Sequence, residues 1–116
     1  MSVSDPLIQA SLLGEAVEHG PVAVFVADDN ARYIAVNGAA CAMLGYSREE
    51  LLGLHVTDVA RYAEAQGEYQ ALLDTGAASG TSTLTRKDGT TVAFTYFSGA
   101  TRVAGMNVYV SVGAAT

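Results

Sequence analysis

The stretch Asn37–Gly53, "NGAACAMLGYSREELLG", decides the local fold because it holds the end of one helix and the start of the next. Its first residue can cap a short apolar helix over residues 38–44, and Gly45 can end that helix in the left-handed conformation. Ser47 and Glu50 have the spacing of a capping box, in which each side chain accepts a hydrogen bond from the other residue's backbone N–H. The sequence therefore predicts two short helices that meet at a fixed angle.

A helix and a hairpin are predicted before this stretch. Asp5-Pro6 supplies a capping side chain and a proline at the first helical position, and apolar residues then recur at helical spacing as far as Val17. We expect the helix to end at residues 19–21, "HGP", where the glycine can adopt the left-handed cap and the proline cannot continue the helix. The β-branched run at 21–27 and the segment at 32–36, joined by the turn "DDNA", predict a hairpin.

A longer helix and three strands are predicted after Gly53. Thr57 or Asp58 is expected to cap one more turn, and a helix ending at Gly76 then carries the apolar stripe Tyr62, Ala65, Tyr69, Leu72 and Leu73. The small-residue segment 75–83, "TGAASGTST", is expected to include a linker. The predicted strands are "GTSTLTR" at 80–86, "TTVAFTYFS" at 90–98 and "GMNVYVSV" at 105–112.

The order of these elements defines the expected fold class. A helix, two strands, several short helices and three strands predict an α+β fold with a five-stranded antiparallel sheet. The first two strands must pair with the last three across the helical segment. Short helices would then lie on one face of the sheet, with the N-terminal helix as a cap.

Composition excludes several classes of function. The chain has 116 residues, half of them apolar, which suits one domain with its own core. Six Lys and Arg residues against twelve Asp and Glu give a net charge of −6, which disfavours direct nucleic-acid binding. A single Cys cannot form an internal disulfide, and no apolar run approaches the ~20 residues that span a bilayer. We expect a cytoplasmic domain that does not associate with membranes.

Two motifs within this order resemble the PAS domain family, over roughly residues 22–112. One is "RKDG" at 86–89, and the other is carried by Asn37, Ala39, Met43-Leu44, Gly45, Tyr46, Ser47, Glu49, Glu50, Leu51 and Gly53. The resemblance implies a scaffold for ligand sensing, cofactor binding or dimerisation, because the fold alone does not define an activity. It divides the chain into a cap helix (1–21), a PAS domain (22–113) and the start of a linker to an effector domain (114–116).

The resemblance also sets the strand register and thereby predicts a pocket. Alternate side chains of a strand face opposite sides of the sheet, so one set faces the helices. This set is aromatic and hydroxyl-bearing without any charge, which suits a small uncharged ligand, although the same rings could simply fill the core. The candidate ligand-binding residues, including two tyrosines from the long helix, are Phe25, Tyr62, Tyr69, Leu84, Phe94, Tyr96, Tyr109 and Ser111.

No cofactor, metal or catalytic site is predicted. The light-sensing branch of the family places a reactive cysteine where this chain has Leu54, His55 and Val56, and Cys41 lies on an earlier helix as a small hydrophobic residue. Haem would need an axial histidine on the long helix, which has none, and two isolated histidines lack metal-ligand spacing. No nucleophile or paired-carboxylate pattern indicates an enzyme.

The opposite face of the sheet predicts an interface. It would expose mostly apolar residues, including Ala93, Thr95 and Val112, so something should cover it. The helix at 7–17 could do so in the same chain or in a partner. We expect a homodimer that buries Leu12, Leu13, Phe97, Met106, Val108 and Val110.

These expectations combine into one function. The chain would be the sensory input domain of a longer cytoplasmic signalling protein, binding a small uncharged ligand or dimerising to control an effector. A helix-turn-helix regulator, a histidine kinase and a diguanylate cyclase are the candidate effectors. The alternative is a ligand-free dimerisation module with no sensing role.

Overall fold

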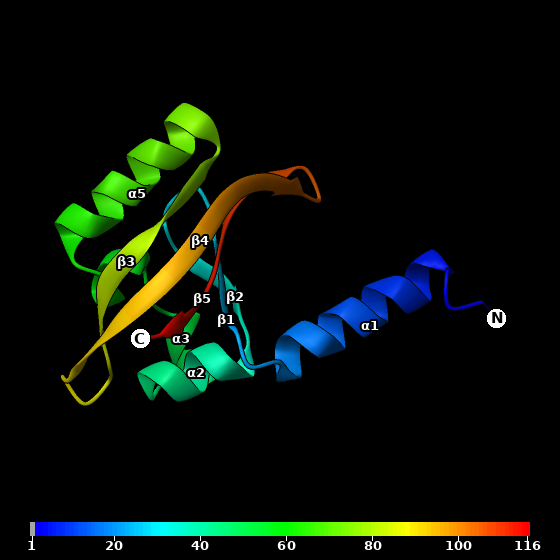
Figure 1. Cartoon of the computed structure of the whole chain (residues 1–116), viewed down its shortest axis with the longest axis horizontal. Coiled ribbons are helices and arrows are strands. Elements are labelled where there is room, and N and C mark those ends of the chain that lie inside the picture. The colour runs from blue at the N-terminus through cyan, green and yellow to red at the C-terminus, as the bar shows by residue number, and fades with distance from the viewer. Residues whose placement is uncertain (1) are drawn as a thin grey trace.

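The elements of the fold follow the predicted order. The computed structural model describes residues 2–116 (Figure 1). Its elements are α1 (Pro6–His19), β1 (Ala23–Ala27), β2 (Tyr33–Val36), α2 (Gly38–Leu44), α3 (Arg48–Leu51), α4 (Val56–Val59), α5 (Tyr62–Thr75), β3 (Ala77–Thr85), β4 (Thr91–Val103) and β5 (Met106–Ala115).

One antiparallel sheet carries the fold, with the strand order β2-β1-β5-β4-β3. β1 pairs with β5 from Ala23, opposite Gly113, to Ala27, opposite Tyr109. The first hairpin therefore joins the last three strands across the helices, which confirms the predicted α+β class. Buried residues of the short helices share one core with buried strand residues, so these helices pack on a single face of the sheet.

The predicted caps of the opening stretch are confirmed. The side chain of Asn37 accepts a hydrogen bond from the Ala40 N–H at 3.1 Å, and Gly45 ends α2 with φ 75°. Ser47 and Glu50 form the capping box, with N–H to oxygen distances of 2.9 Å and 3.1 Å. These bonds satisfy backbone donors that a helix start would otherwise leave without a partner.

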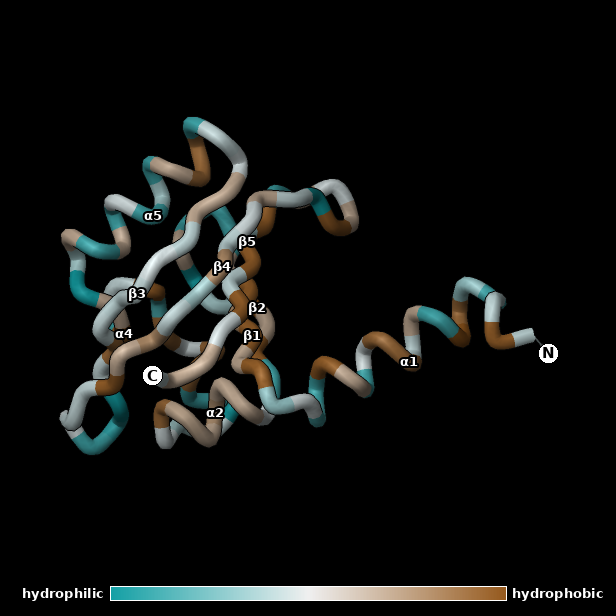
Figure 2. The backbone as a smooth tube through the Cα atoms, in the orientation of Figure 1, coloured by the Kyte–Doolittle hydropathy of each residue, from teal (hydrophilic) through white to brown (hydrophobic). Residues whose placement is uncertain are grey.

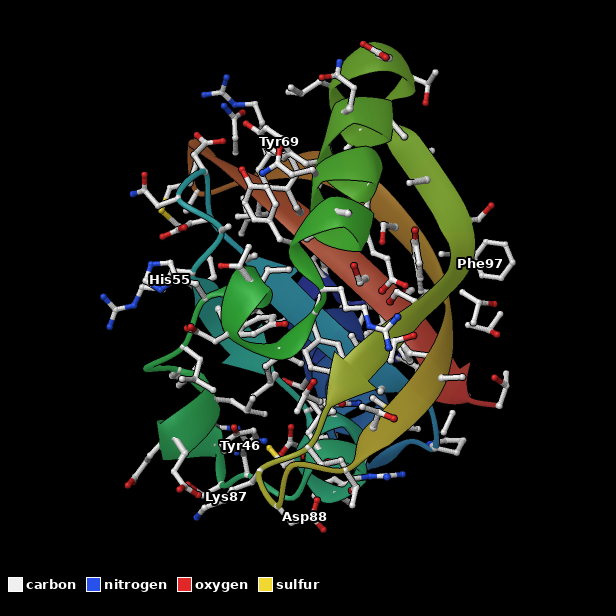
Figure 3. The ribbon with its side chains drawn as sticks, turned by 90° about the vertical axis from the view of Figure 1, so that its left-hand side faces the viewer. Tyr46, His55, Tyr69, Lys87, Asp88 and Phe97 are labelled. Carbon is white, nitrogen blue, oxygen red and sulfur yellow. The ribbon has the colours of Figure 1, made fainter. Side chains whose placement is uncertain are left out.

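The "RKDG" turn docks on the end of α2, so the two motifs form one unit (Figure 3). The Lys87 N–H donates to the Leu44 carbonyl at 2.9 Å, and Arg86 Nε donates to the Met43 carbonyl at 3.0 Å. Both carbonyls belong to the last turn of α2, where helical partners are missing. The Lys87 ammonium lies 2.6 Å from Glu50, and its hydrogen bond lowers the pKa of that carboxyl to about 2.

Two helix-capping expectations differ from the structure. Gly20 ends α1 in an extended conformation with φ −79°, and it is needed because a Cβ there would lie 2.6 Å from the Ala16 carbonyl oxygen. α4 is capped by His55, whose N–H donates to Asp58 at 2.8 Å, so neither Thr57 nor Asp58 is the cap.

The strands also extend beyond their predicted ends. β3 begins at Ala77, so most of the expected small-residue linker is strand. β5 continues to Ala115, two residues past the predicted domain boundary. Small residues have weak strand propensity, and here the ladder to β4 decides the conformation, since Ala77 pairs with Gly99.

α1 extends away from the rest of the fold and does not cover the sheet (Figure 1). None of its residues is buried. Its last turn is attached to the start of α2 and to α3, because Asn37 donates to the Val17 carbonyl and Arg48 forms an ion pair with Glu18. The sequence predicts that this helix covers the outer face of a sheet, in the same chain or in a partner. In the structure α1 does not cover the sheet of its own chain. Among the helices of residues 2–116, none is long and apolar enough to cross a membrane.

Candidate ligand-binding site

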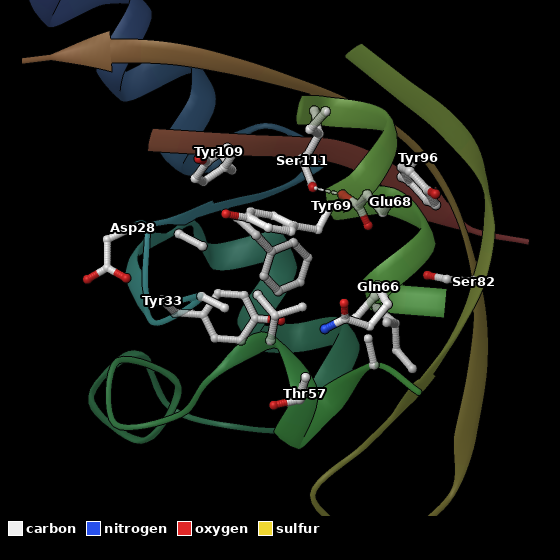
Figure 4. Close-up of a pocket in the computed structure, with 18 of the residues that line it drawn as sticks. Asp28, Tyr33, Thr57, Gln66, Glu68, Tyr69, Ser82, Tyr96, Tyr109 and Ser111 are labelled. Atoms are coloured by element: carbon white, nitrogen blue, oxygen red, sulfur yellow. Dashed lines mark hydrogen bonds between the residues drawn. The ribbon is translucent and has the colours of Figure 1, made fainter. Parts of the chain in front are cut away.

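A cavity of about 290 Å³ lies between the sheet and the helices α4 and α5 (Figure 4). The period of two along the strands creates its sheet wall, since β4 alternates exposed and buried residues from Thr91 to Ser98. α5 forms the opposite wall, and the β1–β2 turn lies at one end.

Almost all of the predicted ligand-binding residues line this cavity. They are Phe25, Tyr69, Leu84, Phe94, Tyr96, Tyr109 and Ser111. Tyr62 does not: its side chain is 69% exposed, and it is the first residue of α5. The helix enters the cavity wall one turn later, at Ala65 and Gln66, so the apolar stripe begins before the helix reaches the sheet.

Six aromatic side chains line the cavity. Phe25 contacts Tyr33 and Phe94 with ring centroids 5.5 Å and 5.7 Å apart, and Phe94 stacks on Tyr96 at 6.2 Å. These are ordinary distances for aromatic pairs in a core. The rings thus hold one another in place and leave space beside them.

A carboxylate that the sequence reasoning missed also lines the cavity. Glu68 Oε1 accepts hydrogen bonds from the Ser98 hydroxyl at 2.6 Å and the Ser111 hydroxyl at 3.0 Å. The prediction of a pocket without charge is therefore wrong. A signal was present: Glu68 follows Ala65 by three residues and precedes Leu72 by four, so helical spacing puts it in the same stripe.

Acidic residues also stand at the β1–β2 turn. Asp28 lines the cavity and organises the turn by accepting the N–H groups of Asn30 and Arg32. Asp29 accepts a hydrogen bond from the Tyr109 hydroxyl at 2.8 Å, and this bond raises the pKa of Tyr109 to about 12. Burial, and then the charge of Glu68, raise the pKa of Tyr33. Tyr33 and Tyr109 are therefore neutral hydrogen-bonding groups near pH 7.

Among the described residues, 2–116, no Lys, Arg or His lines the cavity. His55 is half exposed and lies beside Asp58, and Cys41 packs against the core from α2. Within residues 2–116, no group of three or more His, Cys, Asp and Glu side chains is placed to hold a metal ion.

The outer face of the sheet is largely uncovered. Phe97 is 68% exposed on the side away from α5 (Figure 3), Met106 is also exposed and Val110 is partly buried. Val108 differs from expectation: it is only 1% exposed, so its own chain already buries it and it has no surface to offer a partner. Figure 2 shows that hydrophobic residues recur along α1.

The sequence matches the PAS domain family over residues 21–114, and the chain belongs to that family. No curated protein matches it.

Solved structures of PAS domains have the same fold. A PAS domain from a two-component sensor histidine kinase superposes with a TM-score of 0.84 at 16% identity, covering 97% of this chain and all of the other. The PAS domain of an HTR-like protein from Haloarcula marismortui gives a TM-score of 0.79 at 21% identity, covering 93% and 92% of the two chains. The LOV domain of a blue-light activated histidine kinase from Erythrobacter litoralis gives 0.71 at 20% identity, covering 84% and 98%. At these identities the likeness concerns the fold.

Proposed function

We propose that this chain is the sensory input domain of a signalling protein and that a small molecule bound in the cavity is its signal. The observation that carries the proposal is the cavity of about 290 Å³, which lies at the lower end of the size range of ligand pockets. A core completely filled by its aromatic rings would leave no such space. The role is regulatory and not catalytic, and the domain works in the cytoplasm.

Flavin mononucleotide and haem do not fit the residues present. Both carry acidic groups, and the cavity lining offers three carboxylates and no basic side chain to hold them. His55, the histidine nearest in sequence to the cavity helices, is outside the lining and cannot serve as an axial ligand there. The ligand is accordingly a smaller molecule. Two of the solved structures with the same fold are domains of histidine kinases, which favours a kinase as the effector.

Filling the cavity is expected to remove the ligand without unfolding the domain. Ala65 on α5 lines the cavity, so Ala65→Phe should occupy the space, whereas Ala63→Phe puts the same ring on an exposed position of the same helix. Native mass spectrometry of protein purified from cells should show added mass for the wild type and for Ala63→Phe, released on denaturation. Ala65→Phe should lose most of it, because the ring takes the space that the ligand would occupy.

If wild-type protein purified from cells shows no added mass, ligand sensing is rejected. The dimerisation module without a sensing role would then be the better description.

We also propose that the chain forms a homodimer. Phe97 and Met106 on the sheet and Leu12 and Leu13 on α1 are all exposed in one chain. A 14-residue helix without buried contacts is only marginally stable in water, so α1 needs a surface to pack against. In a two-fold dimer, α1 of each chain can cover the outer sheet face of the other.

Phe97→Glu is expected to dissociate this dimer while leaving the fold intact, since Phe97 is exposed within one chain. Burying an unpaired carboxylate costs several kcal/mol, so the dissociation constant should rise at least about a hundredfold. Leu73→Glu, at an exposed apolar position on α5, is the matched control and should not change it. Sedimentation equilibrium measures both. A monomeric wild type, or a dimer that Phe97→Glu leaves unchanged, would rule out this interface.

A further inference from the structure

The cavity carries negative charge that no residue of the described chain neutralises. Glu68 is half buried in the wall, and no Lys, Arg or His lines the space. Its hydrogen bonds from Ser98 and Ser111 both end on Oε1. Within residues 2–116 no further donor reaches this carboxylate. A carboxylate can accept about four hydrogen bonds, so Glu68 retains acceptor capacity toward the cavity.

The serine hydroxyls are already engaged by this carboxylate. Ser98 and Ser111 lie 2.6 Å apart, and each donates its single proton within the Ser98, Ser111 and Glu68 cluster. They are therefore not free to donate to an acidic group of a ligand. Asp28 and Asp29 add like charge at the turn, so an anion would meet repulsion from the wall and from this end of the cavity.

The aromatic wall favours the opposite charge. The faces of aromatic rings attract cations, and they do so more strongly where water is excluded. Tyr69 and Tyr109 pack edge to face with ring centroids 5.7 Å apart, and both line the same cavity as Glu68. Because Tyr109 stays neutral, it adds a hydrogen-bonding group without adding to the charge.

We propose that the ligand is a small organic cation, an amine whose ammonium group pairs with Glu68 and whose apolar part packs on the aromatic wall. This inference rests on the proposed sensing function and names the ligand class. It replaces the expectation of an uncharged ligand, which assumed a pocket without charge.

The test compares probes that share a framework and differ in charge. 2-Phenylethylamine, 2-phenylethanol and phenylacetate, and the matching hexyl amine, alcohol and carboxylate, are titrated into the full chain at pH 7. Amide chemical shifts report the affinity and the location of binding. In at least one framework the amine is expected to bind about tenfold more tightly than the alcohol, the typical effect of a charge-assisted hydrogen bond, and the carboxylate should bind most weakly.

Glu68→Gln is the decisive variant. Its amide oxygen can still accept from the two serines, so the fold is retained while the charge is removed. The amine should then bind no more tightly than the alcohol. Glu49→Gln removes an equivalent charge from an exposed position on α3 and should leave the preference for the amine unchanged.

Three results would overturn the inference. Alcohols or carboxylates that bind in the cavity as tightly as amines would reject the cation class but keep the sensing function. An amine preference that survives Glu68→Gln would reject Glu68 as the counter-ion. If no amine binds in the cavity, the ligand class is wrong, and the mass of ligand on protein purified from cells decides the sensing function separately.

Discussion

Replacing Asn37 by alanine is expected to lower the free energy of unfolding by about 3 kcal/mol or more. The side chain is only 3% exposed and forms four hydrogen bonds. Its oxygen accepts from the Val24 N–H at 2.9 Å and the Ala40 N–H at 3.1 Å, and its nitrogen donates to the Val17 and Val22 carbonyls at 2.6 Å and 2.8 Å. One residue thus ties together the end of α1, the start of β1 and the start of α2.

The alanine variant leaves these four backbone groups without their partner, and each buried orphan costs about 1–3 kcal/mol where water cannot replace it. Urea unfolding followed by circular dichroism measures the loss. Asn37→Asp keeps the acceptor and removes the donor, so it should lose the bonds to Val17 and Val22 as well as bury a charge. Asn30→Ala, in the exposed β1–β2 turn, should change stability by less than about 0.5 kcal/mol. A loss below about 1 kcal/mol for Asn37→Ala would show that water satisfies the orphaned groups.

Gly113→Ala is expected to destabilise the sheet by about 3 kcal/mol or more, or to prevent folding, because overpacking against backbone exceeds the usual range of about 1–3 kcal/mol. A Cβ at this position would lie 2.0 Å from the Thr95 carbonyl oxygen and 2.9 Å from the ring of Phe94. Gly113 lies on a central strand, paired with Ala23 on one side and Tyr96 on the other. The backbone cannot move away without disturbing both ladders.

Gly67→Ala is the matched control and should have the opposite sign. Gly67 lies within α5, and a Cβ there would have no heavy atom within 4 Å. The alanine should therefore stabilise the domain by about 0.5–1 kcal/mol through helix propensity and a less flexible unfolded chain. Thermal unfolding of both variants against the wild type measures the contrast. Equal stability of Gly113→Ala and the wild type would mean that β5 tolerates a shift that the pairing on both sides should forbid.

Local chemistry was predictable because it depends on near neighbours in the sequence. Asn37, Gly45 and the Ser47–Glu50 pair act over three or four residues, and each is found in its predicted role. In the register that the PAS resemblance implies, the strand period of two placed six of the cavity-lining residues on the correct face: Phe25, Leu84, Phe94, Tyr96, Tyr109 and Ser111. By contrast, Glu68 was not among the predicted site residues, although helical spacing puts it in the same stripe as Ala65 and Leu72.

The errors concern the meeting of distant elements. Tyr62 belongs to the apolar stripe of α5. However, the position at which α5 packs on the sheet determines which of its turns reach the cavity, and the first turn does not. Val108 alternates onto the outer face by register and is nonetheless buried within its own chain. The interface and the ligand remain predictions.

The sequence by itself determined the order of elements, the caps and the faces of the strands, because these depend on backbone hydrogen bonds and side-chain period within a few residues. Only the tertiary structure decided that α1 leaves the sheet uncovered, that the "RKDG" turn closes the end of α2, and that Glu68 meets Ser98 and Ser111. Glu68 lies 30 and 43 residues before these serines, and contacts over such separations depend on how the sheet and helices pack as a whole.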